Sequence, residues 1–378
     1  MKAIINGRIV TPNDVLENKI LIVENGKITG IVDELPKNAA VIDAKGYFVA
    51  AGLIDIHIHG SLGADVMDGT LDAIQTIAQG IAQYGTTSFL PTTMTTEYDD
   101  IIQALTAIRR LQNQPPNGAK ILGAHLEGPF INAKYKGAQN EKFITVPDLE
   151  LIREFADVIK IITYAPEMDA DFAFTKSVKN ETTIKLSIGH SNATYVQAKQ
   201  AIAHGCSNIT HLFNAMTGLH HRDPGIVGAA FMEDVFTEII ADKIHIDQHL
   251  FQFILDNKTA EKVVLITDSM RAGGEPDGMY DLGGQDVIVK KGVATLSDGT
   301  LAGSVLTLNQ AVKNMYDNTT ATLSEVIRMA SLTPATALGI ADHKGSLESG
   351  KDADIILLDE HFNCRLTMVE GDIVYENL

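Results

Sequence analysis

Short runs of Val, Ile and Leu that stop at a histidine or a carboxylate recur through the middle of this chain. Six such runs are present, and three of them contain a glycine: 53–60, 121–128, 186–190, 209–211, 239–245 and 263–268. A short apolar run is typical of a strand buried on both faces of a parallel sheet. Polar groups at the ends of many parallel strands are how a (β/α)8 barrel builds an active site at one rim. We therefore predict an α/β protein with a (β/α)8 TIM-type barrel that serves as a metal-dependent hydrolase.

The order of the predicted elements supports a closed barrel. Segments of strand and helix character alternate between residues 54 and 343, which indicates repeated βα units. Strands are predicted over 53–59, 86–92, 121–127, 159–165, 184–190, 208–213, 237–245 and 263–268. Helices are predicted over 70–84, 97–113, 147–156, 168–180, 193–204, 247–257, 304–317 and 323–330. Eight of each is the number that a barrel needs, and a hairpin (286–289 and 292–296) is predicted to interrupt the last unit.

The two ends of the chain have a different pattern from the middle. Short strand-like runs alternate with turns, and the pairs Asn6-Gly7 and Asn25-Gly26 are strong signals of tight hairpins. The C-terminal stretch around Gly350 and Gly371 behaves in the same way. We expect a small β-sandwich domain built from residues 1–53 and 344–378, with the catalytic barrel, residues 54–343, inserted between them.

Charge and composition exclude several classes of partner. The formal net charge of −18 argues against nucleic acid or an anionic membrane as a partner, although a few local cations could still bind one phosphate. No apolar run approaches the ~18 residues of a membrane span, and the N-terminus has no cleavable apolar segment. The two cysteines are far apart and form no CxxC pair, so a thiolate metal site is not indicated. A soluble cytoplasmic protein is expected.

The polar residues at the strand ends are of the types that bind a divalent metal. Residues two apart in a strand share a face, so His57 and His59 are expected to point the same way. Later strands end at Glu127, His190 and His211. Imidazole nitrogens and carboxylate oxygens suit zinc or iron, and buried ionisable groups are costly unless they are paired or metal-bound. We predict one or two divalent metals held by these five residues, with His125 as a hydrogen-bonded support.

Several longer motifs then identify a family. They are His57-x-His59-Gly60, His125-Leu126-Glu127-Gly128-Pro129-Phe130, Gly189-His190-Ser191, Thr210-His211-Leu212-Phe213-Asn214-Ala215-Met216, Thr267-Asp268 and Gly350-Lys351-Asp352-Ala353-Asp354. Together they resemble the N-acetylglucosamine-6-phosphate deacetylases of the amidohydrolase superfamily, over nearly the whole chain. The resemblance implies hydrolysis of the acetamide of N-acetyl-D-glucosamine 6-phosphate to D-glucosamine 6-phosphate and acetate, in amino-sugar catabolism and cell-wall recycling.

The resemblance also implies roles for individual residues. Glu127, His190 and His211 would bind the main metal, and His57 and His59 a second one. Asp268 would be the catalytic acid and base, and His245 a donor to the oxyanion. Contacts to the sugar phosphate would come from Ala138, Gln139, Asn214, Ala215, Arg222, His245, Ala302, Gly303 and Ser304. The family further implies a homodimer in which Arg222 reaches the site of the neighbouring subunit.

Plainer roles and other substrates stay open. Asp268 could be a metal ligand only, His245 a hydrogen-bonded support, and Arg222 an ordinary surface arginine. Gln139 stands where relatives often have histidine, and Lys243 where glycine is common. The alternatives to the main function are the galactosamine epimer of the substrate, a cyclic amide or amine, and a barrel without catalytic activity.

Overall fold

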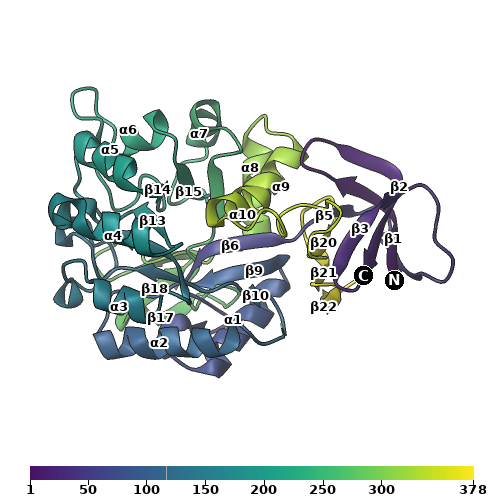
Figure 1. Cartoon of the computed structure of the whole chain (residues 1–378), viewed down its shortest axis with the longest axis horizontal. Helices are drawn as coiled ribbons and strands as arrows, with labels where there is room; N and C mark the ends of the chain where they lie inside the picture. Colours follow the sequence, from purple (N-terminus) through teal and green to yellow (C-terminus); the bar gives the residue numbers. More distant parts are fainter. Residues whose placement is uncertain (116) are drawn as a thin grey trace.

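A barrel and a smaller sheet domain make up the protein, as Figure 1 shows for the computed structural model. The structure describes residues 1–115 and 117–378. Both chain ends, marked N and C, lie in the sheet domain at the right of the view, and the middle of the chain forms the barrel at the left. In the part of the chain that the structure describes, none of the helices has both the length and the apolar character needed to span a membrane.

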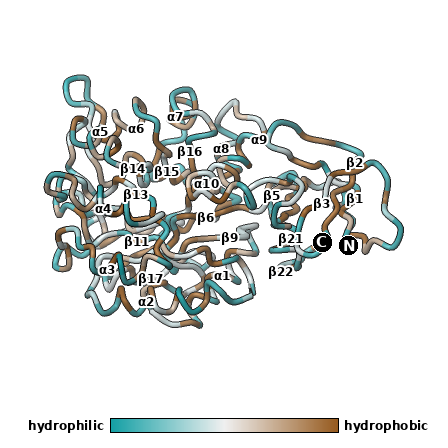
Figure 2. Tube along the Cα trace, viewed as in Figure 1, coloured by the Kyte–Doolittle hydropathy of each residue, from teal (hydrophilic) through white to brown (hydrophobic). Residues whose placement is uncertain are grey.

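The barrel has the eight strand positions that were predicted. Its strands are β6 (Leu53–Ile58), β9 (Thr86–Pro91), β10 (Lys120–Ile121) with β11 (Ala124–Glu127), β12 (Ile159–Tyr164), β13 (Lys185–Ile188), β14 (Cys206–Ile209), β15 (Phe236–Ile240) and β16 (Val263–Ile266). They run parallel in sequence order within two sheets, β6-β9-β10 and β11 to β16. Backbone hydrogen bonds join these sheets at both seams, from Asp268 N to His57 O at 2.9 Å and from Thr93 N to His125 O at 3.0 Å. Figure 2 shows apolar residues along strand β6.

The third barrel strand is interrupted, whereas the sequence predicted one strand over 121–127. β10 pairs with β9, but β11 pairs with β12, so the chain changes partner between the two segments. Gly123 lies at this change with φ 143°, and a Cβ there would come within 2.4 Å of Val158 O. The conformation and the close backbone approach both favour glycine. The interruption is thus a consequence of sheet pairing, which a local sequence pattern does not display.

Helices surround the barrel. They are α1 (Leu71–Ala82), α2 (Tyr98–Leu111), α3 (Leu149–Glu154), α4 (Ala173–Glu181), α5 (Tyr195–His204), α6 (Gly225–Met232), α7 (Leu250–Lys258), α8 (Leu308–Asn318), α9 (Leu323–Met329) and α10 (Leu332–Leu338). Two of them, α6 and α10, were not predicted. α6 is buried over Gly225–Ala230 and has no polar face, so it lacks the amphipathic period of a surface helix. α10 carries Pro334 in its first turn, where proline is tolerated although it usually reads as a helix breaker.

A small antiparallel sheet leaves the barrel after β16. It consists of β17 (Gly278–Leu282), β18 (Gln285–Lys290) and β19 (Val293–Thr295), which contains the predicted hairpin and adds one strand to it. Leu282, Val287 and Val289 pack with Met94 and Met270 in a separate apolar cluster. The Gln285 side chain donates a hydrogen bond to Ala138 O, so this sheet is tied to the loop that follows β11.

The terminal segments form the second domain. Its strands are β1 (Lys2–Val10), β2 (Val15–Glu24), β3 (Lys27–Val32), β4 (Ala40–Asp43), β5 (Phe48–Ala51), β20 (Ile355–Leu358), β21 (Cys364–Val369) and β22 (Asp372–Glu376). All eight are hydrogen-bonded in one sheet, which branches where β1 pairs with β4 and then with β5. The sheet has its own apolar core, separate from that of the barrel. The boundaries 1–53, 54–343 and 344–378 stay predictions.

Candidate metal centre and active site

Glu127, His190 and His211 meet at one end of the barrel. Glu127 is the last residue of β11, and the two histidines lie two residues beyond the ends of β13 and β14. Glu127 Oε1 lies 3.2 Å from His190 Nε2 and 3.1 Å from His211 Nε2, and these two nitrogens are 3.1 Å apart. Three donor atoms at such separations can share one cation, since a zinc ion lies about 2.0–2.2 Å from each such ligand.

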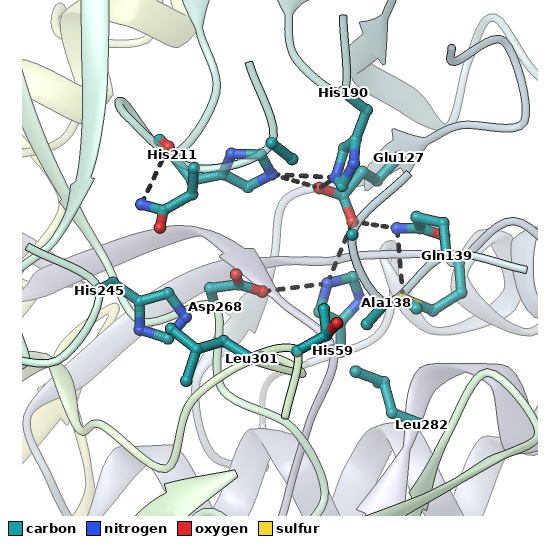
Figure 3. A pocket seen from close by; sticks show the side chains of 16 residues that line it. His59, Glu127, Ala138, Gln139, His190, His211, His245, Asp268, Leu282 and Leu301 are labelled. Carbon is teal, nitrogen blue, oxygen red and sulfur yellow. Dashed lines mark hydrogen bonds and ion pairs between the residues drawn. The ribbon is translucent and has the colours of Figure 1, made fainter. Parts of the chain in front are cut away.

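A second group of donor atoms lies on the other side of Glu127. His59 Nε2 is 3.3 Å from Glu127 Oε2 and 3.2 Å from Asp268 Oδ1. His57 Nε2 is 3.3 Å from Glu127 Oε1 and 3.6 Å from Asp268 Oδ1. Figure 3 shows Glu127 between His190 and His211 on one side and His59 and Asp268 on the other. The carboxylate of Glu127 can therefore serve two adjacent cation positions.

Hydrogen bonds fix the tautomer of three of these histidines. The Nδ1–H groups donate to oxygen acceptors: His59 to Thr92 O at 3.2 Å, His190 to Tyr135 O at 2.9 Å, and His57 to Glu238 Oε2 at 3.1 Å. Each bond leaves the Nε2 lone pair facing the group of donors, which is how a protein orients a metal-binding imidazole. His57 Nε2 is buried and lacks a hydrogen-bond partner among the described residues. The donor set thus fits a divalent metal.

The acids and histidines of this group shift one another's pKa values. Burial alone would lower the pKa of His57, but the carboxylates of Glu127 and Asp268 raise it well above its usual range. Burial opposes the charged form of His59 as well, yet hydrogen bonds to Asp268 and Glu127 raise its pKa to about 9. Asp268 shows the converse: burial would raise its pKa, and His57 and His59 lower it to about 2. His57 and His59 therefore hold protons that a metal ion would replace.

His125 is a support, as the sequence analysis expected. Its Nδ1–H donates to Ile56 O at 2.9 Å, and its Nε2 accepts a hydrogen bond from the Thr163 hydroxyl at 2.7 Å. Thr163 in turn hydrogen-bonds the Thr210 hydroxyl at 2.7 Å. Burial is the main reason that the pKa of His125 lies well below its usual range, so the ring is neutral. Both of its nitrogens are occupied, and neither is available to a metal.

Three of the polar residues have left-handed backbone conformations. His190 has φ 48°, His211 φ 28° and Asp268 φ 48°, and each lies two residues beyond the end of its strand. Such conformations cost roughly 1–3 kcal/mol in residues other than glycine, and they cluster at functional sites. The turn ends the strand ladder early, which is why the observed strands are shorter than the apolar runs.

A cavity of about 230 Å³ opens beside the metal-binding group. Of the residues proposed from the sequence, those that line it are His59, Glu127, Ala138, Gln139, His190, His211, Asn214, Ala215, His245, Asp268 and Gly303. His57 is fully buried, and Ala302 and Ser304 are buried on either side of Gly303. Arg222 is exposed and does not line the cavity. Among residues 1–115 and 117–378, no lysine or arginine lines the cavity either.

Gln139 is held firmly at the edge of the cavity. Its amide oxygen accepts a hydrogen bond from Thr95 N at 2.7 Å, and its Nε2 donates to Glu127 Oε2 at 2.8 Å. The two partners determine which end of the amide is oxygen, because one is a donor and the other an acceptor. Gln139 therefore orients the carboxylate of Glu127, and Figure 3 shows this contact. Glutamine adds no charge here, whereas a histidine can carry one.

His245 faces the same cavity from the loop after β15. Its Nδ1–H donates to Asp242 Oδ2 at 2.7 Å, and Asp242 Oδ1 accepts hydrogen bonds from the backbone of Ile244 and His245. Burial opposes the charge on His245, but the hydrogen bond to Asp242 raises its pKa. Lys243, in the middle of this turn, has φ 70°, which explains why glycine would suit the position.

The sequence analysis missed some residues of the site. The cavity is also lined by Met94, Gly137, Leu282, Thr300 and Leu301, which come from loops and from the sheet β17–β19. Their positions depend on tertiary packing and leave no local signal. Glu238, the acid that contacts His57, did have one: it is a carboxylate inside the apolar run Phe236–Ile240. A buried strand seldom tolerates such a residue without a specific partner.

Comparisons with known proteins agree with this geometry. The sequence pattern of the amidohydrolase family matches residues 48–374. An N-acetylglucosamine-6-phosphate deacetylase of Bacillus subtilis (strain 168) is 41% identical over 97% of this chain and 95% of its own length. An N-acetylgalactosamine-6-phosphate deacetylase of Escherichia coli O157:H7 is 34% identical, over 97% of each chain.

Solved structures give the same result. The crystal structure of the N-acetylglucosamine-6-phosphate deacetylase from Pasteurella multocida is similar to this chain with a TM-score of 0.93 and 34% identity, over 98% of this chain and 99% of that one. A mutant of the Mycobacterium smegmatis deacetylase in complex with N-acetyl-D-glucosamine 6-phosphate has a TM-score of 0.91 and 27% identity, over 99% of each chain. This chain therefore belongs to the amidohydrolase family.

Proposed function

We propose that this protein hydrolyses N-acetyl-D-glucosamine 6-phosphate to D-glucosamine 6-phosphate and acetate. One observation supports this most: Asp268 and the donor atoms of Glu127, His190 and His211 border one cavity. An amide needs an activated water and a proton for the departing amine, and this arrangement offers both at one point. The relatives from Bacillus subtilis and Pasteurella multocida bear the name of this activity.

The side chains divide the chemistry between them. A divalent metal held by Glu127, His190 and His211 would supply an acidified water near neutral pH. Asp268, whose pKa is lowered to about 2, is ionised and can accept the proton of that water. The same carboxyl group then gives the proton to the leaving nitrogen. His245, held by Asp242, presents its other nitrogen to the cavity as a donor to the oxyanion.

Zinc or iron is our proposal for the metal. The ligand set of imidazole nitrogens and carboxylate oxygens suits both ions, and supply in the cell chooses between such metals. Elemental analysis of the protein purified from its own host would identify the ion. Retention of neither zinc nor iron in active protein would contradict this proposal.

The phosphate of the substrate needs a cation, and we propose that a second subunit supplies it. Arg222 lies on an exposed turn where its guanidinium is within 2.7 Å of His221 Nε2, with no acidic partner among the described residues. A guanidinium suits a phosphate because its fork donates two parallel hydrogen bonds. In a homodimer, Arg222 would reach the cavity of the neighbouring subunit. A phosphorylated sugar is a metabolite of the cell interior, so we place the activity in the cytoplasm.

The galactosamine epimer is the second candidate substrate. The relative from Escherichia coli O157:H7, which is 34% identical, is named for that activity. The two sugars differ only in the configuration of one hydroxyl, and a hydrogen-bonding site can discriminate such a difference strongly.

The test is release of acetate from each phosphosugar and from unphosphorylated N-acetylglucosamine, before and after chelation. We expect chelator-sensitive activity that is highest on the glucosamine phosphate. Activity on the epimer alone would keep the mechanism and change the substrate. Activity that persists after complete removal of metal would contradict the proposal.

A further inference from the structure

Glu238 is a buried acid at the centre of the barrel that has no role in the chemistry described so far. It lies on β15 and is 0% exposed. Its Oε2 accepts hydrogen bonds from His57 Nδ1–H at 3.1 Å and, at 3.4 Å, from the backbone N–H of His211. In the part of the chain that the structure describes, neither lysine nor arginine pairs with it, and its Oε1 has no hydrogen-bond partner.

A buried carboxylate with so few partners is costly. Removing a carboxylate from water costs several kcal/mol even after relaxation, and His57 is the one basic side chain that pairs with Glu238 among the described residues. A well-packed apolar residue would fill this part of the barrel at lower cost. The presence of an acid at this depth therefore requires a specific function, and His57 is the side chain that it contacts.

The partners of the other histidines make this contact distinctive. His59 and His190 donate their Nδ1–H to backbone carbonyls, which are neutral acceptors. His57 alone among these three donates to a carboxylate. Such a bond is charge-assisted, and it raises the basicity of the nitrogen on the far side of the ring. That nitrogen is the buried Nε2 of His57, which lies between Glu127 and Asp268.

We infer that Glu238 is a positioning residue that holds His57 as the ligand of a second divalent cation, which His59 and Glu127 also bind. The carboxylate fixes the Nδ1–H tautomer and turns the Nε2 lone pair toward the cation. Glu238 also accepts a hydrogen bond from the backbone N–H of His211. It therefore links the second cation position to the first, which His211 helps to form. The inference rests on the proposed metal centre, and it assigns to Glu238 a function in metal binding without contact to the substrate.

A different use of the same residues is a metal bound directly between His57, His125 and Glu238, whose donor atoms lie close together. The hydrogen bonds argue against it. His125 donates its Nδ1–H to Ile56 O, and its Nε2 already accepts the proton of Thr163. His57 faces Glu238 with the protonated nitrogen. A cation at that position would have to break the hydrogen bond between His57 and Glu238 and one of the two that His125 makes.

Zinc affinity is the measurement that tests the inference. The zinc-loaded enzyme and its Glu238→Gln variant would be titrated with a chelator, and the zinc that remains on each subunit counted by elemental analysis. The amide keeps the shape of the side chain but not its charge. We expect two zinc ions per subunit, one of which is held about 10–100-fold more weakly in the variant. The other ion should be unaffected.

Three further variants separate positioning from a structural effect. Ser88→Ala removes another fully buried polar group of the barrel, one whose hydroxyl has no hydrogen-bond partner among the described residues. Its zinc affinities should match those of the unchanged protein. In the His57→Gln background, Glu238→Gln should cause no further loss, because the residue acts through His57. The amide oxygen in Glu238→Gln can still accept a hydrogen bond from His57. Glu238→Leu removes the acceptor entirely, and it should weaken zinc binding in the same direction.

Three results would overturn the inference. The first is unchanged zinc affinity in Glu238→Gln. The second is an equal loss with and without His57, and the third is a single zinc ion per subunit in the unchanged protein. The proposed function has a separate readout: a protein that shows the zinc coupling but releases no acetate from either phosphosugar would retain the role of Glu238 and refute the substrate.

Discussion

Asp268 lies at the edge of the cavity, in surroundings very different from bulk water. Its side chain is 12% exposed and contacts two histidines, and its backbone is left-handed. The lowered pKa of its carboxyl group follows from His57 and His59, which outweigh the opposing effect of burial. An acid that stays ionised at the edge of a cavity can accept a proton from water there. General acid–base groups of this kind contribute roughly 10²–10⁴-fold to the rate.

The first prediction concerns this carboxyl group. Asp268→Asn should lower kcat by at least ~100-fold and leave substrate binding largely unchanged, because an amide cannot accept the proton. Steady-state kinetics and equilibrium binding of the phosphosugar measure the two effects. Asp247→Asn, a change at an exposed acid, is the matched control. Near-normal turnover in Asp268→Asn would remove this residue from the mechanism.

The second prediction concerns stability against pH in the metal-free protein. The pKa of His59 is raised from 6.5 to about 9, so its stabilising contribution is complete below pH 6.5 and is lost as the pH rises through 9. The pKa of Asp268 is lowered from 3.8 to about 2, so its contribution is present above pH 3.8 and lost as the pH falls through 2.

Thermal unfolding tests this balance. The chelated protein should lose stability between pH 6.5 and 9, by an amount on the order of 1 kcal/mol or more. The zinc-loaded protein should not lose it over that interval, because the metal replaces the proton on His59. Parallel pH profiles with and without zinc would show that the proton and the metal do not compete for the same nitrogen of His59.

At the scale of elements, the turns that end the strands determine where the proposed metal ligands lie. Gly189 joins β13 to His190, and a Cβ at this position would lie 2.7 Å from Thr163 Cγ2 and 2.8 Å from Thr210 Cβ. These two threonines belong to the hydroxyl chain that supports His125. Close packing at Gly189 therefore determines the shape of the turn, the position of the two threonine hydroxyls and the position of His190.

The third prediction follows from that approach. Gly189→Ala should destabilise the protein by roughly 1–3 kcal/mol, as overpacking of a buried site does. Denaturant unfolding of the metal-free protein would measure the loss, and zinc affinity should fall with it. In Gly218→Ala the new methyl group meets no atom within 4 Å, so that variant should be close to neutral. Equal effects of the two substitutions would contradict the packing argument.

The elements also differ in how well their sequence predicted them. Most of the barrel strands were predicted because short apolar runs of strand length have few other uses in a globular protein, and β9 and β14, which are less apolar, were predicted from the alternation of strand and helix. α6 was missed because it is buried on every side and shows no amphipathic period. The break at Gly123 was missed because it marks a change of pairing partner, from β9 to β12.

At the scale of the whole molecule, two features matter: a buried group of ion pairs around Lys344, and the charge of the cavity lining. Lys344 is buried between the barrel and the sheet domain, with Nζ at 2.9 Å from Asp352 and 2.6 Å from Asp354. This gives the Gly350–Asp354 motif a structural role. The cavity, in contrast, has no lysine or arginine among its described lining residues, and its histidines face the metal-binding group or the reacting amide, so we expect the phosphate to be bound by a charge from elsewhere.

The fourth prediction tests the proposed source of that charge. Arg222→Ala should raise KM strongly and leave the metal content unchanged, because the guanidinium meets the phosphate and not the metal. In mixed dimers of Arg222→Ala and Asp268→Asn subunits, one site keeps both groups. Random mixing should restore about one quarter of the wild-type activity, since half the dimers would have one intact site. If mixing the Arg222→Ala and Asp268→Asn proteins restores no activity at low substrate concentration, Arg222 does not act in the site of the neighbouring subunit.

The sequence by itself determined the barrel, the chemistry of its rim and the family. Strand hydrophobicity and ligand type are local properties, and His57, His59, Glu127, His190 and His211 could be named from them. Tertiary structure alone decided which atoms of these residues face one another. It placed Glu238 beneath His57, fixed the histidine tautomers and left Arg222 away from the cavity. Hydrogen-bond partners of this kind lie far apart in the chain, so only folding brings them together.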